Sequence, residues 1–138
     1  MLEPIPEGYY TITPWIISKN SDGLATFIKK VFGGKEKGRV VNDDGSVGHL
    51  EIQIGSSIVM LFDSKQGWPE TPSFMRLYVE DGENVINLAK EAGANVVTKL
   101  TYLFFGESGA NPRSMGQHLV DSATSERGWF VRTRKANA

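Results

Sequence analysis

A strand-turn-helix pattern that occurs twice is the feature that most constrains what this chain can fold into. In residues 15–34, an apolar run and a polar break precede a helical stripe that stops at a glycine pair. Residues 76–94 repeat that plan, with Asp81 as the expected N-cap of the helix and again a glycine as the stop. The two stripes consist of Leu24, Phe27, Ile28, Val31 and Phe32 in the first copy, and of Val85, Leu88, Ala89 and Ala92 in the second. Aligning Gly33 with Gly93 places one stripe on the other, so the sequence predicts a duplicated unit.

Each predicted helix is followed by three segments with strand patterns. After the first helix these are 35–41, 48–54 and 57–62, and after the second they are 95–102, 115–122 and 128–134. A strand is also expected over 9–17, with Pro14 disturbing its pairing, and the very apolar run 57–62 is expected in the middle of a sheet. We therefore predict one α+β domain, residues 1–138, with units at about 9–63 and 74–135 and a linker over 64–73.

Composition and charge narrow the possible classes of function. The 138 residues carry a net charge of -1, which gives no electrostatic reason to expect nucleic acid or an anionic membrane as a partner. The absence of cysteine excludes disulfides, thiolate nucleophiles and sulfur-ligated metal sites. The N-terminus lacks a signal-peptide pattern and no apolar run approaches the ~20 residues of a membrane span, so we expect a cytoplasmic protein. Phosphate-binding loops, dinucleotide fingerprints and nucleophile elbows are also absent.

Several short segments carry a resemblance when their order and spacing are taken together. They are Thr11-Ile12-Thr13-Pro14, Val31-Phe32-Gly33, Gly48-His49-Leu50-Glu51, Tyr78-Val79-Glu80-Asp81, Ala92-Gly93-Ala94 and Phe104-Phe105-Gly106-Glu107. In this arrangement the chain resembles the vicinal oxygen chelate superfamily of glyoxalase, bleomycin-resistance and extradiol dioxygenase proteins, and within it the PhnB-like branch. The resemblance implies two βαβββ units that pair into curved sheets around a cleft, and a homodimer.

The same resemblance implies where a metal would be bound. In metal-dependent members the ligands are His, Gln or Glu on the first and last strands of each unit. The corresponding positions here are Thr13, Met60, Phe74 and Phe130. None of these side chains is a normal ligand for a divalent ion. We therefore expect no metal and no cofactor, and the sequence leaves open whether the protein is an enzyme.

The candidate ligand-binding residues are mostly aromatic. They are Trp15, His49, Glu51, Met60, Phe62, Phe74, Arg76, Tyr78, Tyr102, Phe105 and Trp129. For any single aromatic residue, a place in the core or in a dimer interface is the simpler interpretation, but the set predicts a cleft that stacks a planar ligand. Arg76 interrupts an apolar strand, where it can hold a ligand carboxylate or phosphate or pair with Glu51 or Glu107.

Three hypotheses for function follow. The leading one is a small-molecule binding protein that holds an apolar or aromatic ligand in an aromatic cleft with a degenerate metal site. The second is a metal-dependent lyase, isomerase or dioxygenase that uses His49, Glu51 and His118, because the first two share one face of a strand. The third is a protein-interaction domain whose cleft is filled by side chains.

Overall fold

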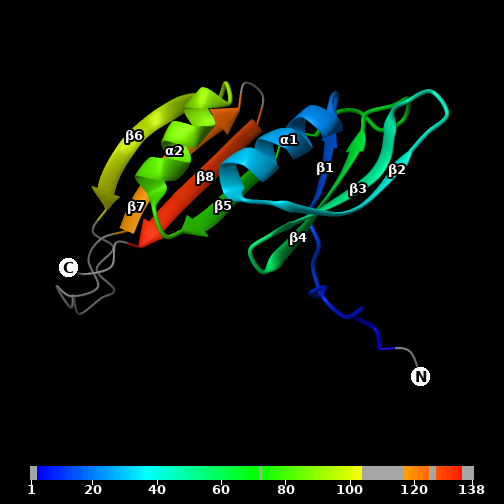
Figure 1. The fold of residues 1–138 in the computed structure, drawn as a ribbon, viewed down its shortest axis with the longest axis horizontal. Helices are drawn as coiled ribbons and strands as arrows, with labels where there is room; N and C mark the ends of the chain where they lie inside the picture. Colours follow the sequence, from blue (N-terminus) through cyan, green and yellow to red (C-terminus); the bar gives the residue numbers. More distant parts are fainter. Residues whose placement is uncertain (1–2, 72, 104–116, 125–126, 135–138) are drawn as a thin grey trace. The chain divides into compact units, whose positions relative to one another are not determined.

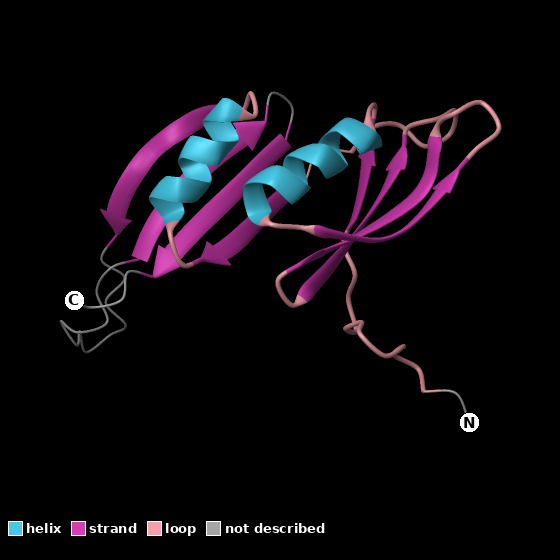
Figure 2. Ribbon diagram, in the orientation of Figure 1, coloured by secondary structure: helices cyan, strands magenta, loops and turns pink. Residues whose placement is uncertain are grey.

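The chain divides into two compact units, residues 1–72 and 73–138, each with the order strand, helix and three strands (Figures 1 and 2). The computed structural model describes residues 3–71, 73–103, 117–124 and 127–134, and it gives only the backbone of Phe74 and of the strands from Asn95 onward. The first unit contains β1 (Trp15–Ser18), α1 (Ser21–Phe32), β2 (Lys35–Val41), β3 (Val47–Ile54) and β4 (Ser57–Asp63). The second contains β5 (Phe74–Val79), α2 (Gly82–Glu91), β6 (Asn95–Leu103), β7 (Gln117–Thr124) and β8 (Arg127–Arg134).

The two sheets have the same topology. Their strand orders are β1-β4-β3-β2 and β5-β8-β7-β6, so the first strand of each unit lies beside the last. That pair is parallel in both sheets, and the other pairs are antiparallel. The predicted duplication and the α+β class are therefore confirmed. The very apolar β4 lies inside its sheet, as its sequence predicts.

The helix α1 packs its apolar stripe against one face of the first sheet, and a cap at each end defines where the helix begins and ends. The side chain of Asn20 accepts a hydrogen bond of 2.9 Å from the Gly23 N–H, which caps the start. Gly33 ends the helix in the left-handed conformation, with φ of 67°. The residues buried at this helix-sheet interface include Leu24, Ala25, Phe27, Ile28 and Val31 from the helix and Ile16, Leu50, Ile52 and Leu61 from the sheet. This interface is the core of the first unit.

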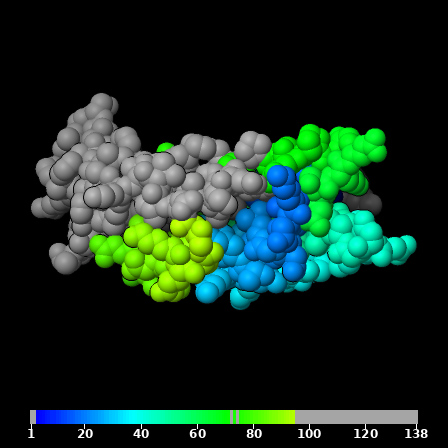
Figure 3. Space-filling model, turned by 90° about the horizontal axis from the view of Figure 1, so that it is seen from above, coloured from blue at the N-terminus to red at the C-terminus, as the bar shows by residue number. Residues whose placement is uncertain are grey.

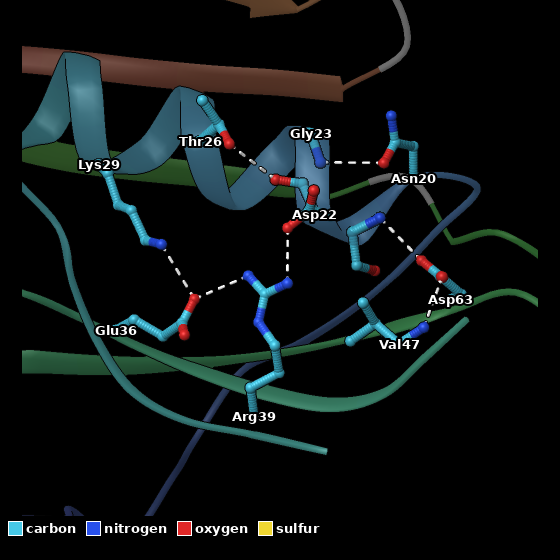
Figure 4. A network of polar contacts seen from close by, with 10 residues as sticks. Asn20, Asp22, Gly23, Thr26, Lys29, Glu36, Arg39, Val47 and Asp63 are labelled. Carbon is cyan, nitrogen blue, oxygen red and sulfur yellow. Dashed lines mark hydrogen bonds and ion pairs between the residues drawn. The ribbon is translucent and has the colours of Figure 1, made fainter. Parts of the chain in front are cut away.

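One carboxylate joins three elements at the start of α1. Asp63, at the end of β4, accepts hydrogen bonds of 2.8 Å from the Ser21 N–H and from the Val47 N–H, one on each carboxylate oxygen (Figure 4). Both donors belong to backbone that would otherwise lack a partner at the end of an element. Asp63 therefore fixes the position of β4 relative to the helix start and to β3.

Exposed ion pairs connect β2 to the helix. The guanidinium of Arg39 contacts Asp22 at 2.6 Å and Glu36 at 2.8 Å, and Lys29 reaches Glu36 at 2.9 Å (Figure 4). The two cations lower the pKa of Glu36, with the Arg39 hydrogen bond as the larger cause. Exposed pairs of this kind contribute about 0–1 kcal/mol each, so they orient β2 more than they stabilise the fold.

The strand predicted over residues 9–17 is wrong for most of its length. β1 begins at Trp15, and residues 9–14 form an irregular segment. Pro14 explains the boundary, because a proline has no N–H to donate to a ladder. Its carbonyl still accepts a 3.0 Å hydrogen bond from the Met60 N–H. The segment before it is free to turn, and Tyr9 donates its N–H to the Pro6 carbonyl at 3.1 Å.

The residues expected to act as a linker pack against β1 in the first unit. The Ser64 N–H donates to the Ser18 carbonyl at 2.8 Å. At the other end of the segment, Thr71 and Ile17 exchange two hydrogen bonds, from Thr71 N to Ile17 O at 3.1 Å and from Ile17 N to Thr71 Oγ1 at 3.2 Å. In the space-filling view the green atoms of this segment adjoin the blue atoms of the N-terminal part of the chain (Figure 3). The segment thus covers the outer edge of β1.

The helix α2 of the second unit begins at the N-cap that the sequence predicts. The carboxylate of Asp81 accepts from the Asn84 N–H at 3.1 Å, which confirms Asp81 as the N-cap of α2. Val85, Ile86 and Ala89 are buried on one side of that helix, which gives it the same amphipathic character as α1. In the part of the chain that the structure describes, neither helix has the length and apolar character needed to cross a membrane.

Candidate ligand-binding site

The face of the first sheet opposite α1 presents polar and aromatic side chains. Successive residues of a strand point to opposite faces, so the burial of Leu50 and Ile52 under α1 places His49, Glu51 and Gln53 on the other side. On β4 the same alternation separates the buried Leu61 from Met60 and Phe62, and on β1 it separates Ile16 from Trp15 and Ile17. This second face carries the candidate site.

Three aromatic rings form one side of that face. Phe62 lies between two tryptophans, with ring centroids 5.6 Å from Trp15 and 5.9 Å from Trp68. Both contacts are edge-to-face, the arrangement that the ring quadrupoles favour. Trp15 is nevertheless 49% exposed and Trp68 is 56% exposed. Each indole therefore leaves about half of its surface available to a further apolar group.

A pocket opens beside these rings. Its volume is about 530 Å³, and its lining residues are Trp15, Ile17, Gly48, Phe62, Lys65, Trp68 and Thr71. Small-molecule sites generally measure about 300–1,000 Å³ and combine apolar walls with a few polar groups. Here the polar groups are the ammonium of Lys65, whose Nζ lies 5.9 Å from the Phe62 ring centroid, and the hydroxyl of Thr71. The size and the lining both match a site for a small organic molecule.

A short polar chain lies next to the aromatic rings. The Tyr9 hydroxyl donates a 2.5 Å hydrogen bond to Glu51 Oε2, and Glu51 Oε1 lies 3.1 Å from His49 Nε2. The imidazole ring of His49 in turn contacts the indole of Trp15, with 5.2 Å between centroids. The Tyr9 hydrogen bond, and then the one with His49, hold the pKa of Glu51 below its usual value. The same bond raises the pKa of Tyr9, so a phenol donor and an ionised acceptor share this contact.

The described residues of this face do not fit a divalent metal. By the sequence resemblance, Thr13 and Met60 stand at the two positions of the first unit where metal-dependent members of that superfamily have ligands. Glu51 already uses one oxygen for Tyr9 and the other for His49. Within the described part of the chain, no three His, Cys, Asp or Glu side chains are grouped as a metal site requires. A metal needs three or more such donors.

The structure brings five of the predicted site residues together on this one face, namely Trp15, His49, Glu51, Met60 and Phe62. Arg76 and Tyr78 lie on one face of β5 in the second unit, and both are exposed. For Phe74, Tyr102 and Trp129, and for His118 of the metal hypothesis, only backbone positions are described. Phe74 pairs with Gly128, Tyr102 with His118, and Trp129 with Met75. Phe105, like Glu107, lies outside the described residues.

The sequence-based prediction missed several pocket residues. Lys65, Trp68 and Thr71 belong to the segment that was interpreted as a linker. A tryptophan in a polar segment, one residue after a glycine, is a signal that could have identified them, because Gly67 adopts φ of 84° in a tight turn. No local pattern points to Tyr9, whose partner Glu51 is 42 residues away.

This chain resembles known proteins in its fold but has no significant match in its sequence. No family model matches this sequence, and no curated protein matches it significantly. TioX from Micromonospora sp. ML1 superposes with a TM-score of 0.68 at 16% identity, covering 91% of this chain and 98% of that one. FosX, a fosfomycin resistance protein from Listeria monocytogenes, gives 0.66 at 8% identity, covering 93% and 94%. A PhnB protein from Bacillus cereus gives 0.61 at 15% identity, covering 90% and 99%. The chain therefore has the fold of these proteins, the glyoxalase/bleomycin resistance fold, as the sequence resemblance predicts.

Proposed function

We propose that this protein binds a small apolar or aromatic molecule in the pocket of its first unit, without a metal ion. The observation that supports the proposal best is the pocket of about 530 Å³ flanked by the half-exposed indoles of Trp15 and Trp68. Two half-exposed indoles that flank one ring and one pocket form a contiguous apolar patch, and such patches usually mark an interface or a ligand site. A planar ligand seated against them would bury apolar surface and gain about 0.5–1.5 kcal/mol for each favourable ring contact.

The structural neighbours support a small-molecule role in general terms. One FosX variant was crystallised with Mn(II) and 1S,2S-dihydroxypropylphosphonic acid, so a protein of this fold holds a small organic acid together with a metal. The present chain differs at the positions where those metal-dependent proteins have ligands. Thr13, in the irregular segment before β1, and Met60, on β4, are not normal ligands for a divalent ion. We therefore propose ligand binding by the aromatic walls rather than by chelation.

A metal-dependent lyase, isomerase or dioxygenase that uses His49, Glu51 and His118 is the second candidate. It is favoured by the contact of 3.1 Å between His49 and Glu51, a pair that could supply two of the three ligands. Elemental analysis of the untagged protein, with thermal melts before and after EDTA, separates the two proposals. One bound divalent ion per chain and a lower melting temperature in EDTA would support the enzyme. No metal and an unchanged melt would support the metal-free binding protein.

The proposal predicts ligand-induced stabilisation that depends on the pocket. A screen of two-ring aromatic compounds by thermal melting should find compounds that raise the melting temperature, since a ligand that binds only the folded state stabilises it. Trp68→Ala should abolish that increase. Tyr10→Ala is the matched control, because Tyr10 is 62% exposed and is not among the residues that line the pocket. Equal responses of the wild type and the Trp68 variant would refute the proposed site.

The third candidate, an interaction domain with a filled cleft, predicts that no small compound binds in this screen. The open pocket of the first unit argues against it. We also propose that the protein is a homodimer, on the resemblance alone, and light scattering coupled to size-exclusion chromatography tests this.

A further inference from the structure

We propose that the ligand of this pocket is a planar aromatic anion, with its ring system against Trp15 and Trp68 and its negative group at Lys65. This inference rests on the proposed function, because it assigns the chemical class of the ligand to the same site. It depends on the position of the Lys65 ammonium, on its lack of an acidic partner among the described residues, and on a second donor beside it.

The position of Lys65 is fixed by the turn that carries Trp68. The two residues exchange backbone hydrogen bonds of 3.0 Å and 2.8 Å, and Gly67 supplies the left-handed residue of this turn. The Lys65 side chain therefore starts from a defined point on the pocket rim. It reaches over the Phe62 ring, with 5.9 Å between Nζ and the centroid of that ring. Among the described lining residues, Lys65 is the only one with a charged side chain.

Nearby acidic groups are engaged elsewhere. Both oxygens of Asp63 accept backbone N–H groups, from Ser21 and from Val47. Glu70 lies 3.8 Å from the ammonium of Lys19. No acidic group of the described chain forms an ion pair with Lys65. The pocket thus offers a cation whose counter-charge a ligand can supply, next to rings that stack on a planar body.

The Thr71 hydroxyl is a second donor in the same pocket. Its oxygen accepts the Ile17 N–H at 3.2 Å, which fixes the hydroxyl in place. A hydroxyl that accepts one hydrogen bond still has its own proton to donate. A carboxylate or sulfonate has several acceptor sites and can use both the ammonium and the hydroxyl. A neutral ligand of the same shape would use at most the hydroxyl, so the site should discriminate by charge.

Equilibrium dialysis with two probes of equal ring size tests the inference. The probes are 2-naphthoate and the neutral 2-naphthylmethanol, measured on the wild type and on Lys65→Gln, Lys65→Arg and Lys30→Gln. Lys30 is the matched control, because it is exposed on α1, which covers the opposite face of the sheet, and its loss changes the net charge equally. Since Lys65 is exposed, we expect the wild type to bind naphthoate about threefold to tenfold more tightly than the alcohol.

The variants separate the inference from the proposed function. Lys65→Gln should lower the affinity for naphthoate much more than that for the alcohol and so remove the preference, whereas Lys65→Arg and Lys30→Gln should keep the preference. If both probes bind the wild type equally well, or if Lys30→Gln reduces the preference as much as Lys65→Gln does, the anion inference is refuted and the aromatic pocket is retained. If neither probe binds, the inference and the proposed pocket fail together.

Discussion

The hydroxyl of Tyr9 and the carboxylate of Glu51 are joined by a hydrogen bond of 2.5 Å across 42 residues of sequence. This contact ties the irregular N-terminal segment to the pocket face of β3. Because Glu51 also contacts His49, and His49 contacts the Trp15 ring, the N-terminal segment is connected to the aromatic wall of the pocket. The state of this one bond should therefore affect both stability and the order of the pocket.

The Tyr9–Glu51 bond should make stability depend on pH at both ends of the range. Glu51 has a lowered pKa, so its contribution is present above its unfolded value of 4.5 and is lost as the pH falls through the folded value. Tyr9 has a raised pKa, so its contribution is present below 10.0 and is lost as the pH rises through the folded value. Tyr9→Phe should reduce the loss of stability at alkaline pH and also the loss at acid pH, as measured by urea unfolding between pH 3 and pH 11. Tyr10→Phe should behave as the wild type, and a Tyr9 variant with an unchanged profile would contradict the role of the bond.

Asp63→Asn should destabilise the first unit strongly for so conservative a change. In the amide an NH2 group replaces one of the two carboxylate oxygens, and it cannot accept the N–H of Ser21 or of Val47 that this oxygen accepts now. Leaving one partly buried donor unsatisfied costs about 1–3 kcal/mol in the free energy of unfolding. Denaturant titration measures the loss. Asp43→Asn, in the exposed turn before β3, is the control and should change stability by less than about 0.5 kcal/mol.

Gly67→Ala should impair both stability and ligand binding. Gly67 has φ of 84°, a conformation that costs an alanine about 1–2 kcal/mol. Relief of that strain would rotate the turn that places Lys65 and Trp68 at the pocket. Gly38→Ala is the control, since Gly38 has no positive φ and a methyl group there would meet no other atom within 4 Å. Retention of full naphthoate binding by the Gly67 variant would show that the turn does not position the pocket residues.

Adjacent residues of β4 should respond very differently to truncation. Leu61 is completely buried under α1, so Leu61→Ala should lower the free energy of unfolding by about 2–5 kcal/mol. Met60 is only partly buried on the pocket face, so Met60→Ala should cost clearly less in stability. Denaturant titrations of both variants check this. Similar losses of stability would indicate that the pocket face is part of the core.

The sequence predicted the fold well because the relevant signals are local. The period of the apolar residues and the glycine stop predicted α1 at the residues where it occurs, and Asp81 was predicted as a cap. Strand alternation likewise predicted that His49 and Glu51 share one face of a strand, and both lie on the same face of β3. These signals lie within one turn of a helix or a few residues of a strand, where the chain's own chemistry decides the outcome.

The remainder of the site was not predictable because it depends on contacts between distant segments. The pairing of Thr71 with Ile17 spans 54 residues, and nothing in the polar segment around Lys65 specifies which strand edge it will cover. The same holds for Tyr9, since a tyrosine in an extended segment has no periodic neighbours that reveal its face. The position of a segment without a periodic pattern of apolar residues is set by the surface against which it packs.

The segment that packs along β1 also has a consequence for self-association. An uncovered edge strand is a template for pairing with another chain, and here the bonds between Thr71 and Ile17 occupy the outer edge of β1. The opposite edge, β2, has two register shifts along its length and carries several lysine and arginine side chains, features that oppose regular edge pairing. Both margins of the first sheet are thus protected against amyloid-like growth, although Trp15 of β1 and Trp68 of the segment after β4 are half-exposed. Concentrated solutions of the protein should accordingly resist fibril formation until the segment over β1 is displaced.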